Sequence, residues 1–176
     1  MCTLLTAVVI ALAGVQAAPP AAGLVFTAPP AWTSRPPASS MRVAEFIVPK
    51  AAGDAEDAEA IIYFFGGSGG SVDANIDRWI GQMQQPDGSA SKEKARRETL
   101  TINGLKVTTV DVAGTYVAEV RPGATERHNK PAFRLRAAVI ETPRGPYYIK
   151  MTGPAKTMAG ADADFKAFVA SVRVDK

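Results

Sequence analysis

The chain has a single cysteine, Cys2, and a single histidine, His128, among its 176 residues. With one cysteine at the second position, a disulfide scaffold, a cysteine-ligated metal and a thiol nucleophile are all excluded from the rest of the chain. A Ser-His-Asp set would require His128, in the polar loop 126–130, to meet a serine. We expect His128 to be an exposed loop residue. The sequence assigns no catalytic residue, no metal ligand and no cofactor.

Charged residues are absent from the N-terminus until Arg35. Residues 3–15 form an uninterrupted apolar run, and Val15 and Ala17 then place small residues at the −3 and −1 positions of a signal-peptidase cut. The run is too short to span a hydrocarbon core, which needs about 20 apolar residues. We therefore expect a signal peptide over 1–17 and an exported, periplasmic or extracellular protein with no transmembrane span after cleavage. Because the usual N-terminal cation is missing, an upstream start and an uncleaved N-terminal anchor stay as alternatives.

The remaining residues have the composition of one globular domain. Hydrophobic residues make up 47% of the chain and the formal net charge is +3, so disorder over most of the chain is not expected. Residues 18–23 form an Ala/Pro spacer, and residues 24–176 form a single domain. Such a domain, without disulfides, has to be held by its hydrophobic core.

The first half of this domain predicts three strands and one helix. Short apolar or alternating segments at 24–26, 41–48 and 60–65 are typical of strands, the last covered on both faces. Trp32 lies between prolines, and we expect it to close one end of the core. Apolar residues spaced as on one helical face then predict a helix over 71–85, capped by Ser71 or Asp73; they are Ile76, Trp79, Ile80 and Met83.

The second half changes to a period of two. Strands 100–102 and 105–112 flank Asn103-Gly104, which is a strong hairpin signal, and a separate strand follows over 115–120. Segment 133–141 is expected to pair with 147–151. A closing helix is predicted over 162–172 with Asp162 as its cap. This order favours an α+β fold, an antiparallel β-sheet with helices packed on both of its faces.

Several of these residues occur in a familiar arrangement. Phe26, Pro29 and Trp32 stand near the start, Gly153-Pro154 precedes a final helix with the Phe-x-x-Phe-Val pattern of 165–169, and segment 75–82 reads NIDRWIGQ. Together with the element order over about 24–174, this resembles the PsbP-like domain, the fold of the extrinsic photosystem II protein and of many uncharacterised exported bacterial proteins. The resemblance implies an α/β/α sandwich around an antiparallel sheet. It implies neither an assigned activity nor photosystem binding.

Two polar features are candidates for ligand or partner binding. On the predicted helix, Asn75, Arg78 and Gln82 share a face beside Trp79. They form either a row that faces a ligand or a set of hydrogen bonds that fixes the helix to neighbouring loops, and the second interpretation is favoured. The glycine-rich segment 66–70 lacks the Lys-Ser/Thr of a phosphate-binding loop and is interpreted as a flexible connection.

The second feature is a basic loop and the strand after it. Residues 121–136 contain one acid, Glu126, and five cations: Arg121, Arg127, Lys130, Arg134 and Arg136. Such a segment suits an anionic envelope component or an acidic face of another protein, or else it is an ordinary basic surface. Nucleic acid is not expected as a partner. The sequence thus favours an exported, non-enzymatic binding or accessory domain. The alternative is a small-ligand carrier or a hydrolase with a pocket beside the first helix, lined by Arg78, Trp79 and Gln82.

Overall fold

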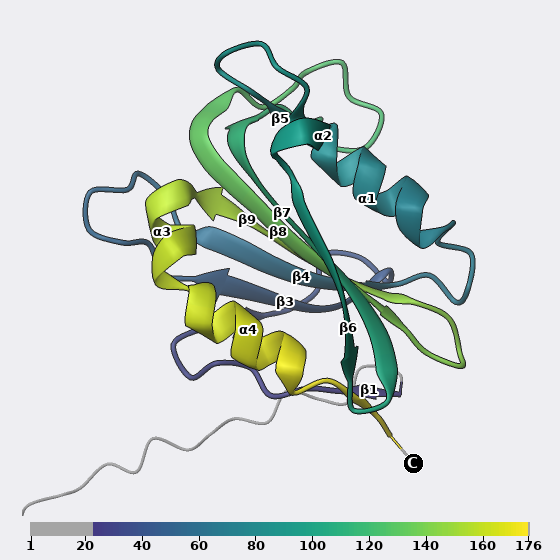
Figure 1. The fold of residues 1–176 in the computed structure, drawn as a ribbon. Coiled ribbons are helices and arrows are strands. Elements are labelled where there is room, and N and C mark those ends of the chain that lie inside the picture. The colour runs from purple at the N-terminus through teal and green to yellow at the C-terminus, as the bar shows by residue number, and fades with distance from the viewer. Residues whose placement is uncertain (1–22, 176) are drawn as a thin grey trace, which may run out of the picture.

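A large antiparallel sheet with helices on both faces makes up the computed structural model, which describes residues 23–175 (Figure 1). Its strand order is β2-β3-β4-β9-β8-β7-β5, and β6 also pairs with β7. The sheet strands are β2 (Thr33–Arg35), β3 (Arg42–Val48), β4 (Ala58–Phe64), β5 (Met83–Gln84), β6 (Arg96–Ile102), β7 (Leu105–Tyr116), β8 (Lys130–Glu141) and β9 (Tyr147–Pro154). A separate pair joins β1 (Leu24–Val25) to β10 (Arg173–Val174). The predicted α+β class is confirmed.

The helices divide between the two faces of the sheet (Figure 1). Helix α1 (Val72–Ile80), followed by the short α2 (Ser91–Lys94), lies on one side, and α3 (Ala155–Gly160) with α4 (Asp162–Ala170) lies on the other. The side that α1 covers is called the α1 face below, and the opposite side is called the α4 face. Because both faces carry helices, alternate residues of β8 and β9 are buried on opposite sides, and those strands are apolar over most of their length.

Each face has its own hydrophobic core. On the α4 face, Phe168 is fully buried and its ring meets those of Phe26, Trp32 and Phe46 at centroid distances of 5.3, 5.1 and 5.9 Å. Trp32 therefore belongs to the core as predicted. On the α1 face, the buried Trp79 packs edge-on against Tyr148 at 6.1 Å.

The hairpin at Asn103-Gly104 is confirmed. Ile102 lies opposite Leu105, and the two turn residues have φ of 49° and 79°. Two consecutive positive φ values define a type I′ turn, whose twist matches that of the flanking strands. Asn103 also fixes the turn to the C-terminal segment, because its Nδ2 donates to the carbonyl of Val172 at 2.8 Å.

The helix predicted over 71–85 is too long. Ser71 caps it as expected, accepting a hydrogen bond from the amide of Ala74, but α1 ends at Ile80. Met83, which has the right spacing for the helix, instead pairs with Tyr116 in the sheet. A buried apolar residue fits both the spacing of a helix and the alternation of a strand, so the spacing alone could not show where the helix ends.

The second half differs from the prediction in several places. The strand expected at 105–112 continues without a break into the one expected at 115–120, forming β7 with a register shift between Gly114 and Tyr116, but β7 ends at Tyr116 and does not extend to 120. Helix α3 was not predicted. Helix α4 begins at Asp162 as expected, but no side chain caps it, because the Asp162 carboxylate binds arginines of β8.

Residues 1–22 lie outside the described part of the chain, so the predicted signal peptide over 1–17 and most of the spacer over 18–23 are not addressed by the structure. Within residues 23–175, no helix is long and apolar enough to cross a membrane.

Candidate functional site

Lys150 lies on β9 with its ammonium group among neutral oxygens. Its Nζ is 2.6 Å from Oε1 of Gln82 and 3.1 Å from the hydroxyl of Tyr116, and it lies 5.2 Å from the centre of the Tyr116 ring. Lys150 alternates with Ile149 and Met151 of the α4-face core, so its side chain is on the α1 face. No carboxylate lies within ion-pairing distance of this amine in the part of the chain that the structure describes.

The surroundings of Lys150 disfavour its charge. Burial is the largest cause, the cations of Arg78 and Arg42 add to it, and Glu59 opposes it; together they lower the pKa of Lys150 to about 8. A buried ammonium group ordinarily requires an anionic partner to offset its lost hydration. Here the hydrogen-bond partners of the amine are neutral oxygens, and the charge of Glu59 acts on it only from beyond ion-pairing distance. The local field therefore favours an added anion.

Two tyrosines lie close to the amine. Burial raises the pKa of Tyr116 to about 12, with smaller contributions from Tyr63 and Glu59, and burial also raises the pKa of Tyr63. Both phenols are therefore neutral hydrogen-bonding groups near pH 7. Tyr116 is held between the rings of His128, at 5.4 Å, and Phe133, at 6.1 Å. His128 is thus half-buried against Tyr116, whereas the sequence predicted an exposed loop residue.

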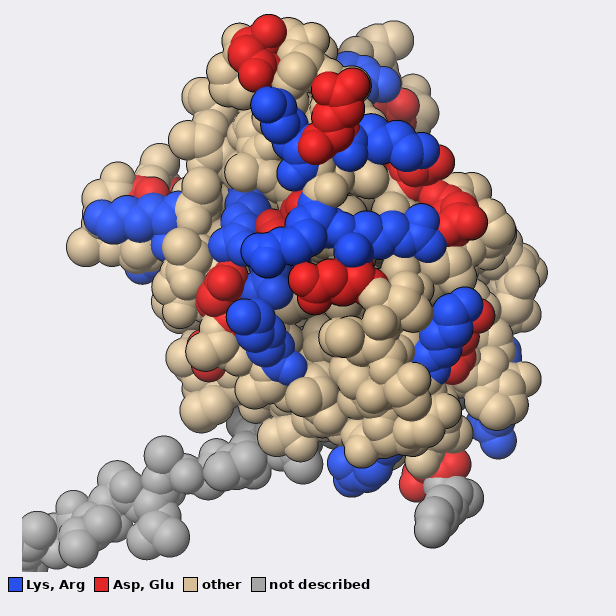
Figure 2. Space-filling view, viewed as in Figure 1, with Lys and Arg blue, Asp and Glu red and all other residues tan. Residues whose placement is uncertain are grey.

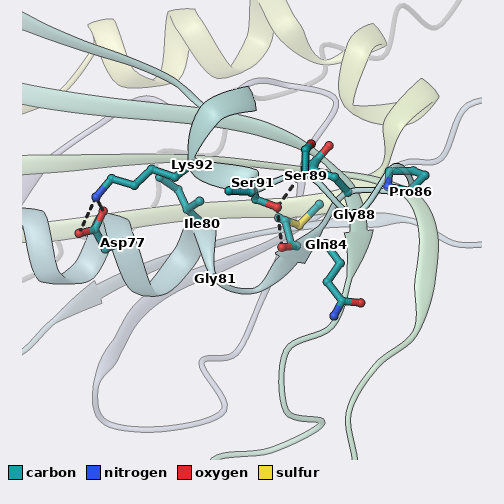
Figure 3. A pocket seen from close by; sticks show the side chains of 12 residues that line it. Asp77, Ile80, Gly81, Gln84, Pro86, Gly88, Ser89, Ser91 and Lys92 are labelled. Atoms are coloured by element: carbon teal, nitrogen blue, oxygen red, sulfur yellow. Dashed lines mark hydrogen bonds and ion pairs between the residues drawn. The ribbon is translucent and has the colours of Figure 1, made fainter.

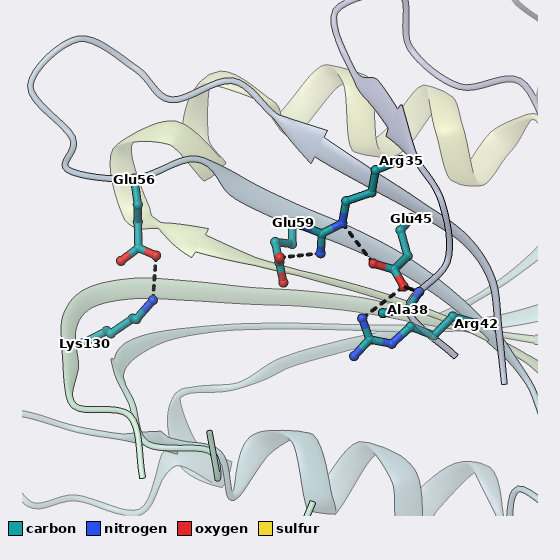
Figure 4. A network of polar contacts seen from close by, with 7 residues as sticks. All are labelled: Arg35, Ala38, Arg42, Glu45, Glu56, Glu59 and Lys130. Atoms are coloured by element: carbon teal, nitrogen blue, oxygen red, sulfur yellow. Dashed lines mark hydrogen bonds and ion pairs between the residues drawn. The ribbon is translucent and has the colours of Figure 1, made fainter. Parts of the chain in front are cut away.

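Glu45 and Glu59, on β3 and β4, form ion pairs with arginines (Figure 4). Glu45 is 1% exposed and accepts from Nε of Arg35 at 2.9 Å, from Arg42 at 3.0 Å and from the amide of Ala38 at 2.6 Å. Arg35 also donates to Glu59 at 2.5 Å. Burial pushes the pKa of Glu45 upward, but the Ala38 amide and the two guanidinium groups outweigh it, and the pKa lies below its usual value. Neither Lys150 nor Arg78, which donates to Asn75, has an ion pair with a carboxylate in the described part of the chain.

We call Lys150, Tyr116, Gln82, Arg78 and Arg42 the Lys150 site. It draws on β9, β7, α1 and the turn that follows it, and β3. The guanidinium group of Arg42 also lies 5.8 Å from the centre of the Tyr63 ring, which places it against the same part of the sheet. Three cations and a phenol thus gather on one side of the sheet.

The candidate residues that the sequence predicted on the first helix have different roles in the structure. Asn75 is buried and donates to the carbonyls of Gly69 and Ser71 at 2.6 and 3.0 Å, while Arg78 donates to its Oδ1 at 2.6 Å. Asn75 therefore fixes the helix to the preceding loop, which is the interpretation favoured from the sequence. Trp79 is part of the core. Gln82 lies beyond the helix end and reaches Lys150.

The basic loop does not form one patch. Arg134 binds Asp111 at 2.5 Å and Asp162 at 2.9 Å, and Arg136 binds Asp162 at 2.9 Å with its guanidinium group 4.4 Å from the centre of the Phe165 ring. These arginines lie on the α4 face. The space-filling view, in the orientation of Figure 1, shows Lys and Arg side chains in a band with Asp and Glu beside them (Figure 2).

The other cations of that loop have different surroundings. Lys130 binds Glu56 at 2.5 Å, and Arg127 donates to the carbonyl of Val117 and lies 3.8 Å from Glu119. Arg121 is exposed. Because most of these charges are compensated by local acids, the excess of cations in the sequence does not translate into a single positive surface.

A cavity of about 700 Å³ lies beside the end of α1 (Figure 3). Ile80 and Met83 contribute its apolar wall, and an ion pair of 3.1 Å joins Lys92 to Asp77 at one side. The cavity does not contain the lining expected from the sequence, because Arg78, Trp79 and Gln82 are not among its residues. A smaller cavity of about 110 Å³ adjoins Arg134 and Arg136. Within residues 23–175 no three His, Cys, Asp or Glu side chains are grouped to hold a metal ion.

Comparison with known proteins gives similarity at the level of structure. No family model and no curated protein matches the chain. A protein of unknown function from Pseudomonas aeruginosa, PA94, is similar with a TM-score of 0.50 and 14% identity, over 82% of this chain and 98% of that one. Cyanobacterial PsbP (CyanoP) from Synechocystis sp. PCC 6803 has a TM-score of 0.49 and 12% identity, over 87% of each chain. At 14% identity the likeness to the Pseudomonas protein concerns the fold alone.

Proposed function

We propose that this protein is an exported, non-enzymatic binding module of the cell envelope that holds an anionic ligand at the Lys150 site. The observation that carries the proposal is the ammonium group of the half-buried Lys150, which meets neutral oxygens at 2.6 and 3.1 Å and has no carboxylate within ion-pairing distance among the described residues. A carboxylate or phosphate oxygen would supply the missing negative charge and accept a charge-assisted hydrogen bond. Arg78 and Arg42 would favour the same charge.

The chemistry of the surrounding groups favours binding over catalysis. Tyr116 and Tyr63, like other phenols, are protonated near neutral pH, and burial raises the pKa of each further, so neither is a ready base. Glu45 is occupied by three donors, and Glu59 is held by Arg35. The groups that remain, an amine, guanidinium groups and a phenol, are donors that recognise an anion.

The test is calorimetric titration of the full chain with inorganic phosphate and with citrate at low ionic strength and pH 7. Lys150→Met is compared with Lys106→Met, which removes the same charge from an exposed lysine of β7 that binds Glu141. A hydrogen bond to a charged group contributes about 1.5–3 kcal/mol, which corresponds to a weakening of roughly 10- to 100-fold in Lys150→Met. The control should bind like the parent. Equal affinity in both variants, or no binding of either probe to the parent, would refute the proposal.

A small-ligand carrier is a second candidate, supported by the cavity beside α1. The cavity combines the apolar Ile80 and Met83 with amide and hydroxyl groups, including Gln84 and Ser91. Such a lining suits an uncharged polar ligand. Ala90→Trp, which places a large ring in the cavity wall, should abolish the thermal stabilisation given by such a ligand and leave anion binding at Lys150 unchanged. A ligand whose stabilisation survives this substitution binds elsewhere.

A further inference from the structure

The open edge of β6 is a surface separate from the Lys150 site. β6 pairs with β7 on one side only, and six of its seven residues are exposed. Leu100, 44% exposed, is one of three large hydrophobic residues exposed within 23–175. An edge strand that is long and accessible presents a row of unpaired amide and carbonyl groups to any second strand.

The hairpin turn determines which backbone groups face outward. In a two-residue turn the closing pair, Ile102 and Leu105, exchanges hydrogen bonds, and pairing alternates along an antiparallel ladder. The amide and carbonyl groups of Thr101, Thr99 and Arg97 therefore point away from β7. Within the described chain these groups have no hydrogen-bond partner. Three residues with free donors and acceptors form a continuous template.

The edge carries little of the usual protection against pairing. Natural edge strands are blocked by lysines, prolines, bulges or inward-pointing charges. Charges occur here at the beginning of the strand, and the charge of Arg97 is compensated by Asp73 at 2.5 Å. The second half, Thr99 to Ile102, contains no charge, no proline and no register shift.

We propose that β6 pairs with β6 of a second copy of this chain, antiparallel and about a two-fold axis at Thr99. In this register Thr99 lies opposite Thr99 of the second copy, and Arg97 lies opposite Thr101 on each side of the axis. These three outward-facing pairs form six backbone hydrogen bonds. Arg96 then lies opposite Ile102 and Glu98 opposite Leu100, so no like charges are directly opposed. The strand is thus compatible with itself in both hydrogen bonding and charge.

Cross-linking tests the register directly. Directly opposed residues in a hydrogen-bonded antiparallel pair have Cα atoms about 5.5 Å apart, which is within the range that a disulfide spans. Thr99→Cys in the full chain should form a covalent dimer under mild oxidation. Thr101→Cys should not exceed the level of the parent chain, because each Thr101 faces Arg97 and not its own copy; the parent also controls for Cys2.

Light scattering after size-exclusion chromatography tests the pairing itself. The parent chain should show a doubling of mass as concentration rises. Thr99→Pro removes an outward amide without removing a hydrogen bond to β7 and should stay monomeric, whereas Thr99→Val should still dimerise. A parent chain that is monomeric throughout, or equal cross-linking of Thr99→Cys and Thr101→Cys, would overturn the proposal. Loss of anion binding in Lys150→Met would leave it unaffected.

Discussion

Glu45→Gln is the substitution whose effect on stability follows most directly from the contacts at the Lys150 site. The Glu45 carboxylate is 1% exposed and accepts hydrogen bonds from Arg35, Arg42 and the Ala38 amide at 2.9, 3.0 and 2.6 Å. Removing one partner of a buried ion pair leaves the other charges buried without compensation, which costs about 3–5 kcal/mol. The amide of glutamine keeps one acceptor oxygen but places a donor against a guanidinium group.

The expected result is a large loss of thermal stability at pH 7. For a domain of this size, each kcal/mol lowers the melting temperature by about 2–4 °C, so we expect a decrease of roughly 6–20 °C. Glu59→Gln is the matched control, because Glu59 is 46% exposed at its side chain and binds Arg35 alone. An exposed ion pair contributes about 0–1 kcal/mol, and the control should remain close to the parent.

The pH dependence of stability provides a second test of the same substitution. The folded protein holds the pKa of Glu45 below its usual value of 4.5, so its contribution to stability is complete above that pH and is lost as pH falls through the folded-state pKa. The difference between parent and Glu45→Gln, measured by urea unfolding, should therefore shrink when pH decreases from 7 to below 4.5. Surface substitutions usually change the free energy of unfolding by less than about 0.5 kcal/mol. A difference that small between the parent and Glu45→Gln at pH 7 would refute the reasoning.

Three further predictions concern Lys150, the aromatic core and the hairpin turn. The pKa of Lys150 is lowered to about 8 from 10.5, so the unfolding free energy of the parent should rise as pH increases between these values, whereas that of Lys150→Met should not. Urea unfolding at a series of pH values measures how the unfolding free energy changes with pH. The same pH dependence in both proteins would contradict the placement of this amine. Phe168→Ala removes a fully buried ring that meets three others and should destabilise the chain by about 3–5 kcal/mol; a loss below about 1 kcal/mol in thermal unfolding would count against this core. Gly104→Ala places a Cβ on a residue with φ 79° and should lower the free energy of unfolding by about 1–2 kcal/mol. Gly160→Ala, in a helix with open space around the added Cβ, should not lower it. Equal effects of the two substitutions on the free energy of unfolding would argue against the type I′ turn.

The sequence predicted the elements whose signals are local. The strand at Arg42–Val48, the Asn103-Gly104 hairpin and the helix beginning at Asp162 each depend on periodicity or turn chemistry within a few residues. The end of α1 was misplaced because Met83 fits the apolar stripe of a helix and also fits a sheet. Residues 113 and 114 were left between two predicted strands, yet Gly114 continues β7 at a point where a Cβ would lie 2.5 Å from the carbonyl oxygen of Gln84.

The candidate site was less accessible to sequence reasoning. Arg78 and Gln82 were singled out on the predicted helix, but their neighbour Lys150 comes from a strand 68 residues after Gln82. The alternation of side chains along β9 would have placed Lys150 on the face opposite to Ile149 and Met151. A lysine within such an apolar strand is the signal that a charged side chain lies on a face of the sheet that is covered by a helix. The basic loop was overestimated because Asp111 and Asp162, which neutralise Arg134 and Arg136, lie elsewhere in the sequence.

The measurement that tests the central claim most directly is the NMR titration of the Lys150 side chain, assigned with Lys150→Arg, with and without saturating citrate. We predict a pKa near 8 in the free protein and a higher value in the presence of the anion, since a bound negative charge favours the ammonium form. A pKa of 10.5 that the anion does not change would contradict both the buried setting of the amine and its role in binding.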